Sequence, residues 1–112
     1  MPRLNPTKNL LRGTLELLLL QALAEKKLHG YAIARRIEAE SGDVLSVEEG
    51  SMYPALYRLE ELGFVSASWT QDGGRRLRSY ALTASGRARL ASHKREWATF
   101  AKAVSRMVGG GR

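Results

Sequence analysis

The chain has 112 residues, 44% of them apolar and 26% charged, which is enough for one domain with one modest core. It has no cysteine, which excludes disulfides, thiolate metal sites and cysteine nucleophiles and fits a reducing cytoplasm. Its net charge of +7 indicates nucleic acid or another anionic surface as a partner.

The charge is divided into three blocks along the chain. Residues 1–36 carry seven basic and two acidic side chains, and residues 37–63 carry one basic and seven acidic. Residues 64–112 carry ten basic and two acidic side chains. A mixed solvated surface would spread these charges, so the blocks favour a localised face that binds anions.

The N-terminal segment predicts a loose basic arm over residues 1–6, followed by a helix that Thr7 can cap and that runs to about Ala24. Its apolar residues lie on more than one side, so more than one neighbour should bury it. The apolar run also suits a secretory signal, but Glu16 and Gln21 interrupt it, and no stretch reaches the length of a membrane span. We therefore expect a cytoplasmic protein.

A second helix is expected over residues 31–41, ended by Gly42 and followed by a loop over residues 43–47. The side chains expected to face inward are Tyr31, Ile33, Ala34 and Ile37. Arg35 and Arg36 should point outward, where they can hold backbone phosphate together with the amides at the start of this helix.

A third helix ends at Gly63, and its apolar stripe consists of Met52, Leu56, Leu59 and Leu62. Its start carries conflicting signals, because Ser46 and Glu49 match a capping box whereas Pro54 prefers the first turn. We expect an initial turn over residues 47–50 and a regular helix over residues 51–62. The side chains that fall largely off the stripe, and are therefore free for a partner, are Ser51, Tyr53, Tyr57 and Arg58.

A β-hairpin follows, with a strand over residues 64–71, a turn at Asp72-Gly73-Gly74 and a return strand over residues 75–83. Tyr80 and Leu82 mark the apolar end of the return strand, which should lie against the body. The other end is basic and should project, and its arginines are Arg75, Arg76 and Arg78.

Thr83 can cap a last helix over residues 84–108, and residues 109–112 form a flexible tail. The helix carries a heptad-like seam made of Leu90, His93, Trp97, Phe100, Val104 and Met107. A lone helix would expose Trp97 and Phe100 to water, so the seam should dock on the body or on a second subunit. Trp97 is first a dimer-seam residue, with a stacking surface for a planar ligand between two subunits as a second interpretation.

The order of three helices, a hairpin and a helix is that of a winged helix, in which the third helix enters the major groove and the hairpin reaches the flanking DNA. Candidate DNA contacts are Arg35, Arg36, Ser51, Tyr53, Tyr57, Arg58, Arg75, Arg76 and Arg78. Other interpretations remain, since the two tyrosines can be half-buried core aromatics and the hairpin arginines can protect an edge strand. The acidic Glu48 and Glu49 are expected to bond backbone amides or a neighbouring arginine.

Four motifs resemble those of the PadR-like transcriptional regulators, in the order of that family and across roughly residues 8–107. They are Leu11-Arg12-Gly13-Thr14-Leu15, His29-Gly30-Tyr31, the run from Glu49 to Glu60, and Gly74-Arg75-Arg76 leading to Tyr80-Ala81-Leu82-Thr83. The resemblance implies a dimeric winged-helix regulator of the subgroup with a single terminal helix, usually a repressor, with some members binding small molecules at the dimer interface. Ala84 departs from the pattern where the family often has proline, and Met52 replaces the commoner leucine.

These observations predict a mainly α protein with a small β-hairpin, with a DNA-binding domain over residues 1–83 and a dimerisation helix over residues 84–108. The expected function is a homodimeric repressor that binds a palindromic operator and is released by a small hydrophobic or planar ligand at the dimer seam. The alternative is a winged-helix module that uses the seam to bind another protein. We expect no cofactor, metal or enzymatic activity, because no carboxylate pair, phosphate-binding loop or nucleophile motif occurs.

Overall fold

The computed structural model describes residues 7–109, with side chains from residue 14 onward. The expected arm over residues 1–6 and most of the expected tail lie outside the described residues. The elements confirm a mainly α fold with a β-hairpin. They are α1 (Thr7–Ala22), β1 (Leu28–His29), α2 (Gly30–Glu40), α3 (Glu49–Glu61), β2 (Val65–Asp72), β3 (Arg75–Leu82) and α4 (Ala84–Val108).

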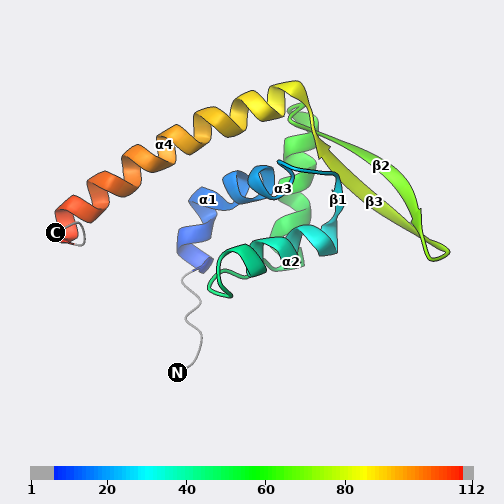
Figure 1. The fold of residues 1–112 in the computed structure, drawn as a ribbon, viewed down its shortest axis with the longest axis horizontal. Coiled ribbons are helices and arrows are strands. Elements are labelled where there is room, and N and C mark those ends of the chain that lie inside the picture. The colour runs from blue at the N-terminus through cyan, green and yellow to red at the C-terminus, as the bar shows by residue number, and fades with distance from the viewer. Residues whose placement is uncertain (1–6, 110–112) are drawn as a thin grey trace.

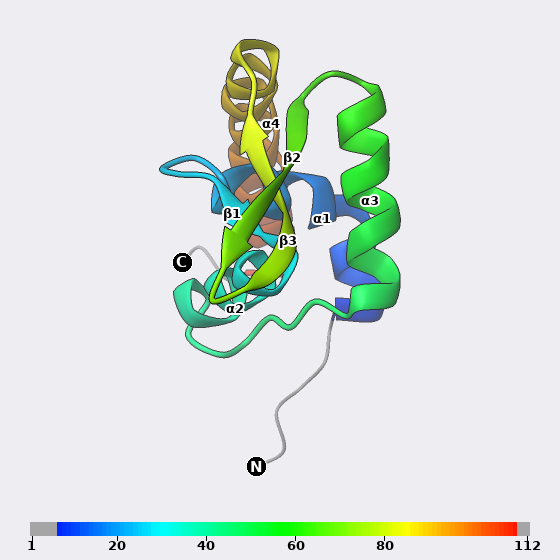
Figure 2. The same ribbon diagram turned by 90° about the vertical axis from the view of Figure 1, so that its right-hand side faces the viewer.

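Helices α1, α2 and α3 gather into a body from which two elements project (Figure 1). The β2–β3 hairpin extends to one side, and α4 runs in the opposite direction until its C-terminal end lies far from the hairpin tip. Figure 2 views the molecule from the side to which the hairpin projects, and α3 runs vertically along one edge of the body. The hairpin thus lies at one end of the molecule and the C-terminal part of α4 at the other, with α3 in the body between them.

The core lies where α1 meets the other helices and the base of the hairpin. As its wide apolar surface predicted, α1 contacts α2, α3 and α4. The largest fully buried side chains come from all parts of the body and are Leu19, Leu20, Leu23, Ile33, Met52, Leu56, Leu59 and Tyr80. The stripe of α3 is therefore what anchors that helix, and the opposite side of α3 is left for other contacts.

A short strand, β1, is the element that the sequence did not predict. It pairs with β3, Leu28 opposite Tyr80 and His29 opposite Ser79, and so completes a three-stranded antiparallel sheet in the order β1-β3-β2. Two residues are too few to show an alternating pattern. Strand β1 ties the start of α2 to the base of the hairpin.

Two side chains expected in the core are exposed. Tyr31 is 60% exposed because it precedes Ile33 by two residues, which places it about 200° around the helix from that buried side chain. Leu62 is also 60% exposed, since it is the C-cap that follows the last residue of α3, after which the chain turns at Gly63.

The start of α3 differs from both expected starts. The helix begins at Glu49, within the segment expected to form an initial turn over residues 47–50, so the regular helix starts two residues before the expected Ser51. Its N-cap is Glu48, not Ser46, and Glu48 makes no side-chain capping hydrogen bond. Pro54 consequently lies inside the helix, on its exposed side. A proline in the second turn removes one backbone hydrogen bond, which costs least where water can replace it.

A close joint connects the end of α3 with the start of α4. Thr83 caps α4 as predicted, because its Oγ1 accepts a hydrogen bond from the Gly86 amide at 3.0 Å. The Thr83 and Ser85 hydroxyls both donate to the carbonyl of Gly63, at 2.6 and 2.9 Å. A Cβ on Gly86 would lie 1.9 Å from the carbonyl oxygen of Phe64, so only glycine allows α4 to approach this backbone.

Candidate nucleic-acid interface

The exposed side of α3 carries three of the expected DNA contacts. Ser51, Tyr57 and Arg58 are exposed, with Tyr57 at 56%, while the apolar stripe holds the helix on the body. Hydroxyl and guanidinium groups can bond base edges or phosphates. This side of α3 can therefore enter a groove without disturbing the core.

Tyr53 differs from Tyr57, because it is half-buried and packs against the core. Its ring lies over Gly30, where an added Cβ would come within 2.3 Å of the Tyr53 hydroxyl. Burial, with a smaller contribution from the Glu49 carboxylate, raises the pKa of the Tyr53 phenol. Tyr53 therefore fastens α3 to the start of α2, and its role in binding DNA stays a prediction.

The two arginines of α2 also differ. Arg35 is exposed, donates to the Tyr31 hydroxyl at 3.1 Å and lies 3.8 Å from the Glu38 carboxylate. Its guanidinium also lies 5.8 Å from the centre of the Tyr31 ring. Arg35 is thus held at the surface beside an exposed tyrosine, where it can reach a phosphate.

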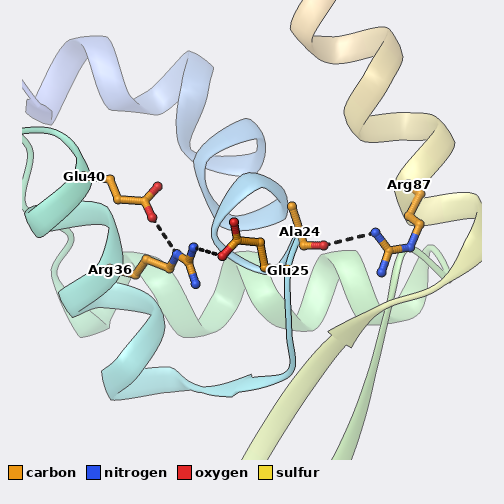
Figure 3. A network of polar contacts seen from close by, with 5 residues as sticks. All are labelled: Ala24, Glu25, Arg36, Glu40 and Arg87. Carbon is orange, nitrogen blue, oxygen red and sulfur yellow. Dashed lines mark hydrogen bonds and ion pairs between the residues drawn. The ribbon is translucent and has the colours of Figure 1, made fainter.

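Arg36 instead links two segments of the body. Its guanidinium is paired with the carboxylates of Glu25 and Glu40, and the hydrogen bond from Arg36 lowers the pKa of Glu25 (Figure 3). Nearby, Arg87 of α4 donates to the carbonyl of Ala24 at 3.1 Å (Figure 3). Since two carboxylates already neutralise it, Arg36 is a weaker candidate for phosphate than Arg35.

The hairpin has the two-residue glycine turn that the sequence predicted. Gly73 and Gly74 have φ angles of 59° and 81°, and Asp72 pairs with Arg75 across the turn. Two consecutive positive φ angles are typical of the tight turns whose twist matches that of the strands. The turn carries the basic end of the hairpin away from the body.

The three hairpin arginines are not equivalent. Arg75 and Arg76 are exposed near the tip, whereas Arg78 is half-buried and its Nη2 lies 3.2 Å from Glu60 Oε2 on α3. This ion pair holds the hairpin against α3. Burial of Tyr80 raises the pKa of its phenol, an effect that Arg78 partly opposes. Arg75 and Arg76 therefore carry the free positive charge of the hairpin.

Trp69 is a feature of the hairpin that the sequence interpretation missed. It lies opposite Arg78 and is 55% exposed, and the Arg76 and Arg78 guanidinium carbons lie 4.6 and 5.5 Å from the centre of its rings. Counting strand partners outward from a two-residue Gly73-Gly74 turn would have placed Trp69 opposite Arg78. That register was the signal that could have found it.

Two carboxylates stand at the start of α3. Glu48 and Glu49 are exposed, and neither forms an ion pair or a hydrogen bond with another described side chain, so the expected partners are absent. Negative charge at this end complements the helix dipole but repels phosphate. These two carboxylates therefore make the first turn of α3 less favourable for phosphate than the exposed arginines of the hairpin.

The seam of α4 divides into two parts. Leu90 is buried and His93 is half-buried, with Nδ1 3.9 Å from the Glu16 carboxylate of α1. Beyond them the seam leaves the body, and Trp97, Phe100, Val104 and Met107 are 44, 60, 42 and 85% exposed. The rings of Trp97 and Phe100 lie 6.0 Å apart. The described side chains of the body do not cover this half of the seam.

Within the described range, no three side chains of the types that bind metals cluster together. None of the helices between residues 7 and 109 combines the length and the apolar character needed to cross a lipid bilayer.

Three packed helices followed by a basic β-hairpin define a winged-helix domain of the DNA-binding class. Residues 19–92 match the model of the transcriptional regulator PadR-like family. The chain therefore belongs to the PadR-like family of transcriptional regulators, which confirms the resemblance found in its motifs.

Known proteins extend this likeness over nearly the whole chain. A PadR family transcriptional regulator from Eggerthella lenta is 28% identical, with a TM-score of 0.77 over 91% of this chain and 88% of that one. A transcriptional regulator from Clostridium thermocellum has a TM-score of 0.82 over 89% of this chain and 98% of that one, and its 24% identity supports the fold alone. Uncharacterized protein X of Lysinibacillus sphaericus is 28% identical over 104 residues, 91% of this chain and 94% of that protein.

Proposed function

We propose that the protein is a homodimeric repressor that occupies a palindromic site on double-stranded DNA. Residues 1–83 form the part that binds DNA, and residues 84–108 form the helix that joins two copies. The observation that carries the proposal is that α3 has exposed polar side chains and that the hairpin beside it has two exposed arginines, Arg75 and Arg76. Occupation of a promoter by such a dimer would block transcription.

Affinity and sequence preference should come from these two elements separately. Arg75 and Arg76 at the hairpin tip make no ion pair with another described residue, so both are available for phosphates or a narrow minor groove. Tyr57 and Arg58 on α3 lie where a major groove would receive the helix. The hairpin then supplies much of the affinity, and α3 supplies discrimination.

The exposed half of the α4 seam supports the second copy. Aromatic side chains are enriched at the centres of protein interfaces, and a solvent-exposed row of Trp97, Phe100, Val104 and Met107 is costly unless covered. A symmetric dimer would cover it with the same row of a second chain. Two α3 helices about 34–36 Å apart could then read successive major grooves.

The test is duplex binding as a function of salt. A protein with several arginine–phosphate contacts should lose affinity steeply as salt rises. Replacement of Arg75 and Arg76 together by alanine should weaken binding to all sequences and reduce the salt dependence. Replacement of Tyr53 or Arg58 by alanine should also relax the sequence preference. Absence of measurable duplex binding at low salt would refute the proposal, and a footprint on the upstream DNA of the gene would locate the site.

We also propose that a small planar, hydrophobic ligand between two copies of α4 releases the repressor. The exposed, neighbouring rings of Trp97 and Phe100 support this step. Because the chain has two tryptophans, the test uses Trp69→Phe, which leaves Trp97 as the one tryptophan, excited selectively over the tyrosines. A panel of planar hydrophobic compounds should include some that change its fluorescence, and an unchanged signal throughout the panel would remove the main support for a ligand.

A further inference from the structure

Trp69 lies on the side of the hairpin that continues the core. The register places Ala67 opposite Tyr80 and Trp69 opposite Arg78, so these side chains share one face of the two strands. Tyr80 on this face is buried in the body, whereas Trp69, one pair further along, is 55% exposed. One face of the hairpin is therefore buried at its base and exposed toward its tip, and Trp69 lies at the boundary between the two parts.

The guanidinium carbon of Arg76 lies over this tryptophan, 4.6 Å from the ring centre. A guanidinium stacked on a ring by its face keeps its N–H groups, which point outward in the plane, free for phosphate or base edges. In the described part of the chain, Arg76 makes no hydrogen bond or ion pair. Its donors are thus unused while its orientation is restricted.

Arg78 is the second arginine whose guanidinium lies over the ring of Trp69. Its guanidinium carbon lies 5.5 Å from the centre of Trp69, and its Nη2 is 3.2 Å from Glu60 on α3. A continuous row, Glu60–Arg78–Trp69–Arg76, therefore runs from α3 to the hairpin tip. This row of contacts links the position of Arg76 to the position of α3.

We infer that Trp69 is a positioning residue for DNA binding, which holds the Arg76 guanidinium ready for the duplex beside α3. This inference rests on the proposed DNA binding. An arginine on a flexible hairpin loses rotamer freedom when it binds, and a stacked arginine has already lost part of it. A stacked guanidinium is also stabilised more when the duplex displaces water from the ring.

The experiment measures the affinity for a fluorescein-labelled duplex of fixed random sequence at low salt, by anisotropy. Trp69→Leu should weaken binding by about 3- to 10-fold, the range of a cation–π contact at a partly exposed site, and Trp69→Phe by less. Ser68→Ala, an exposed neighbour on the opposite face of the same strand, should bind like the wild type. Circular dichroism should show that all these variants are folded.

The decisive comparison uses Arg76→Ala. If Trp69 acts through Arg76, Trp69→Leu should cause no further loss in the Arg76→Ala background. A full, additive loss there, or wild-type affinity for Trp69→Leu alone, would overturn the inference while leaving DNA binding intact. Failure of the wild type to bind any duplex would remove the proposed function and this inference with it.

Discussion

Helices α3 and α4 carry similar apolar stripes, and the surroundings of the two stripes differ. In α3, Met52, Leu56 and Leu59 are completely buried against the body. In α4, Trp97 and Phe100 are 44% and 60% exposed, although they recur with the same helical spacing. The body covers α4 only as far as Leu90 and His93.

The difference shows that an apolar stripe on a helix predicts burial against another surface. It does not indicate whether that surface belongs to the same chain or to a second one. The α3 stripe is covered within the chain and fixes the orientation of a helix whose other side is free. The distal α4 stripe is covered by nothing in the described part of the chain. We interpret α3 as anchored for reading DNA and α4 as reserved for association.

The largest expected effect concerns association. Replacement of Trp97 and Phe100 together by serine should raise the dissociation constant of the dimer by about 100-fold or more, because central aromatic residues dominate interface energies. Sedimentation velocity over a range of concentrations measures it, with Arg95→Ser on the opposite side of α4 as the matched control. A wild type that stays monomeric throughout, or a double variant that associates equally well, would contradict the interpretation of α4.

Leu56→Ala should lower the free energy of unfolding by about 2–5 kcal/mol, because it removes a completely buried side chain and leaves a cavity. Urea unfolding measures the loss, which should not depend on protein concentration. Val104→Ala on α4 is the comparison variant, and its effect should vary with concentration because it acts through association. Equal, concentration-independent losses in both variants would erase the distinction between the two stripes.

Gly86→Ala tests the joint that connects the two helices. The added Cβ would meet the Phe64 carbonyl oxygen, a backbone atom, so we expect a loss of about 1–3 kcal/mol in thermal or urea unfolding. Gly50→Ala in α3 is the matched control, since a Cβ there meets nothing within 4 Å. That substitution should leave stability unchanged or raise it by up to about 1 kcal/mol.

Thr83→Ala removes the cap of α4 and one of the two hydroxyls that bond the Gly63 carbonyl. The expected loss of unfolding free energy is about 1 kcal/mol, and Thr83→Ser should restore most of it. Thr99→Ala, an exposed substitution in the middle of α4, should leave the free energy of unfolding in urea unchanged or raise it by less than about 1 kcal/mol. A neutral Thr83→Ala would show that the joint does not depend on this hydroxyl.

The smallest expected effect is on the pH dependence of the free energy of unfolding. Arg36 lowers the pKa of Glu25 below its ordinary 4.5 in the folded chain. As pH falls, the Glu25 carboxylate is therefore protonated in the unfolded chain before it is protonated in the folded chain. The contribution of the Arg36–Glu25 interaction to the free energy of unfolding is complete above the ordinary pKa and is lost as pH falls through the folded pKa. Glu25→Gln should make the loss of stability in acid slightly less steep, as measured by unfolding between neutral and acidic pH.

The main outline could be predicted from local signals. Helical spacing identified the buried stripe of α3, the paired glycines identified the hairpin turn, and Thr83 identified the start of α4. Each of these signals is a short pattern whose physical cause lies within a few residues. The family motifs likewise lie within continuous stretches, and the PadR-like match confirms their interpretation.

What the sequence did not disclose depends on partners far along the chain. Strand β1 exists because Leu28 meets Tyr80, a pairing across about fifty residues that no local pattern reveals. Gly30 is needed because the ring of Tyr53 occupies the space of a side chain. From the sequence alone there was no reason to expect ion-pair partners for Arg36 and Arg78. In the structure Arg36 pairs with Glu25 and Arg78 pairs with Glu60.

The joint at Gly63 and Thr83 makes α4 a lever. With 25 residues at 1.5 Å each, the helix is about 38 Å long, and its first turn is fixed to the end of α3. A shift of about 3 Å at its far end would turn it by roughly 5° about the joint, because the length of the arm converts small displacements into small, defined rotations. Because Gly86 lets the first turn of α4 lie against the backbone that follows α3, a rotation of α4 about this joint would act directly on the end of α3.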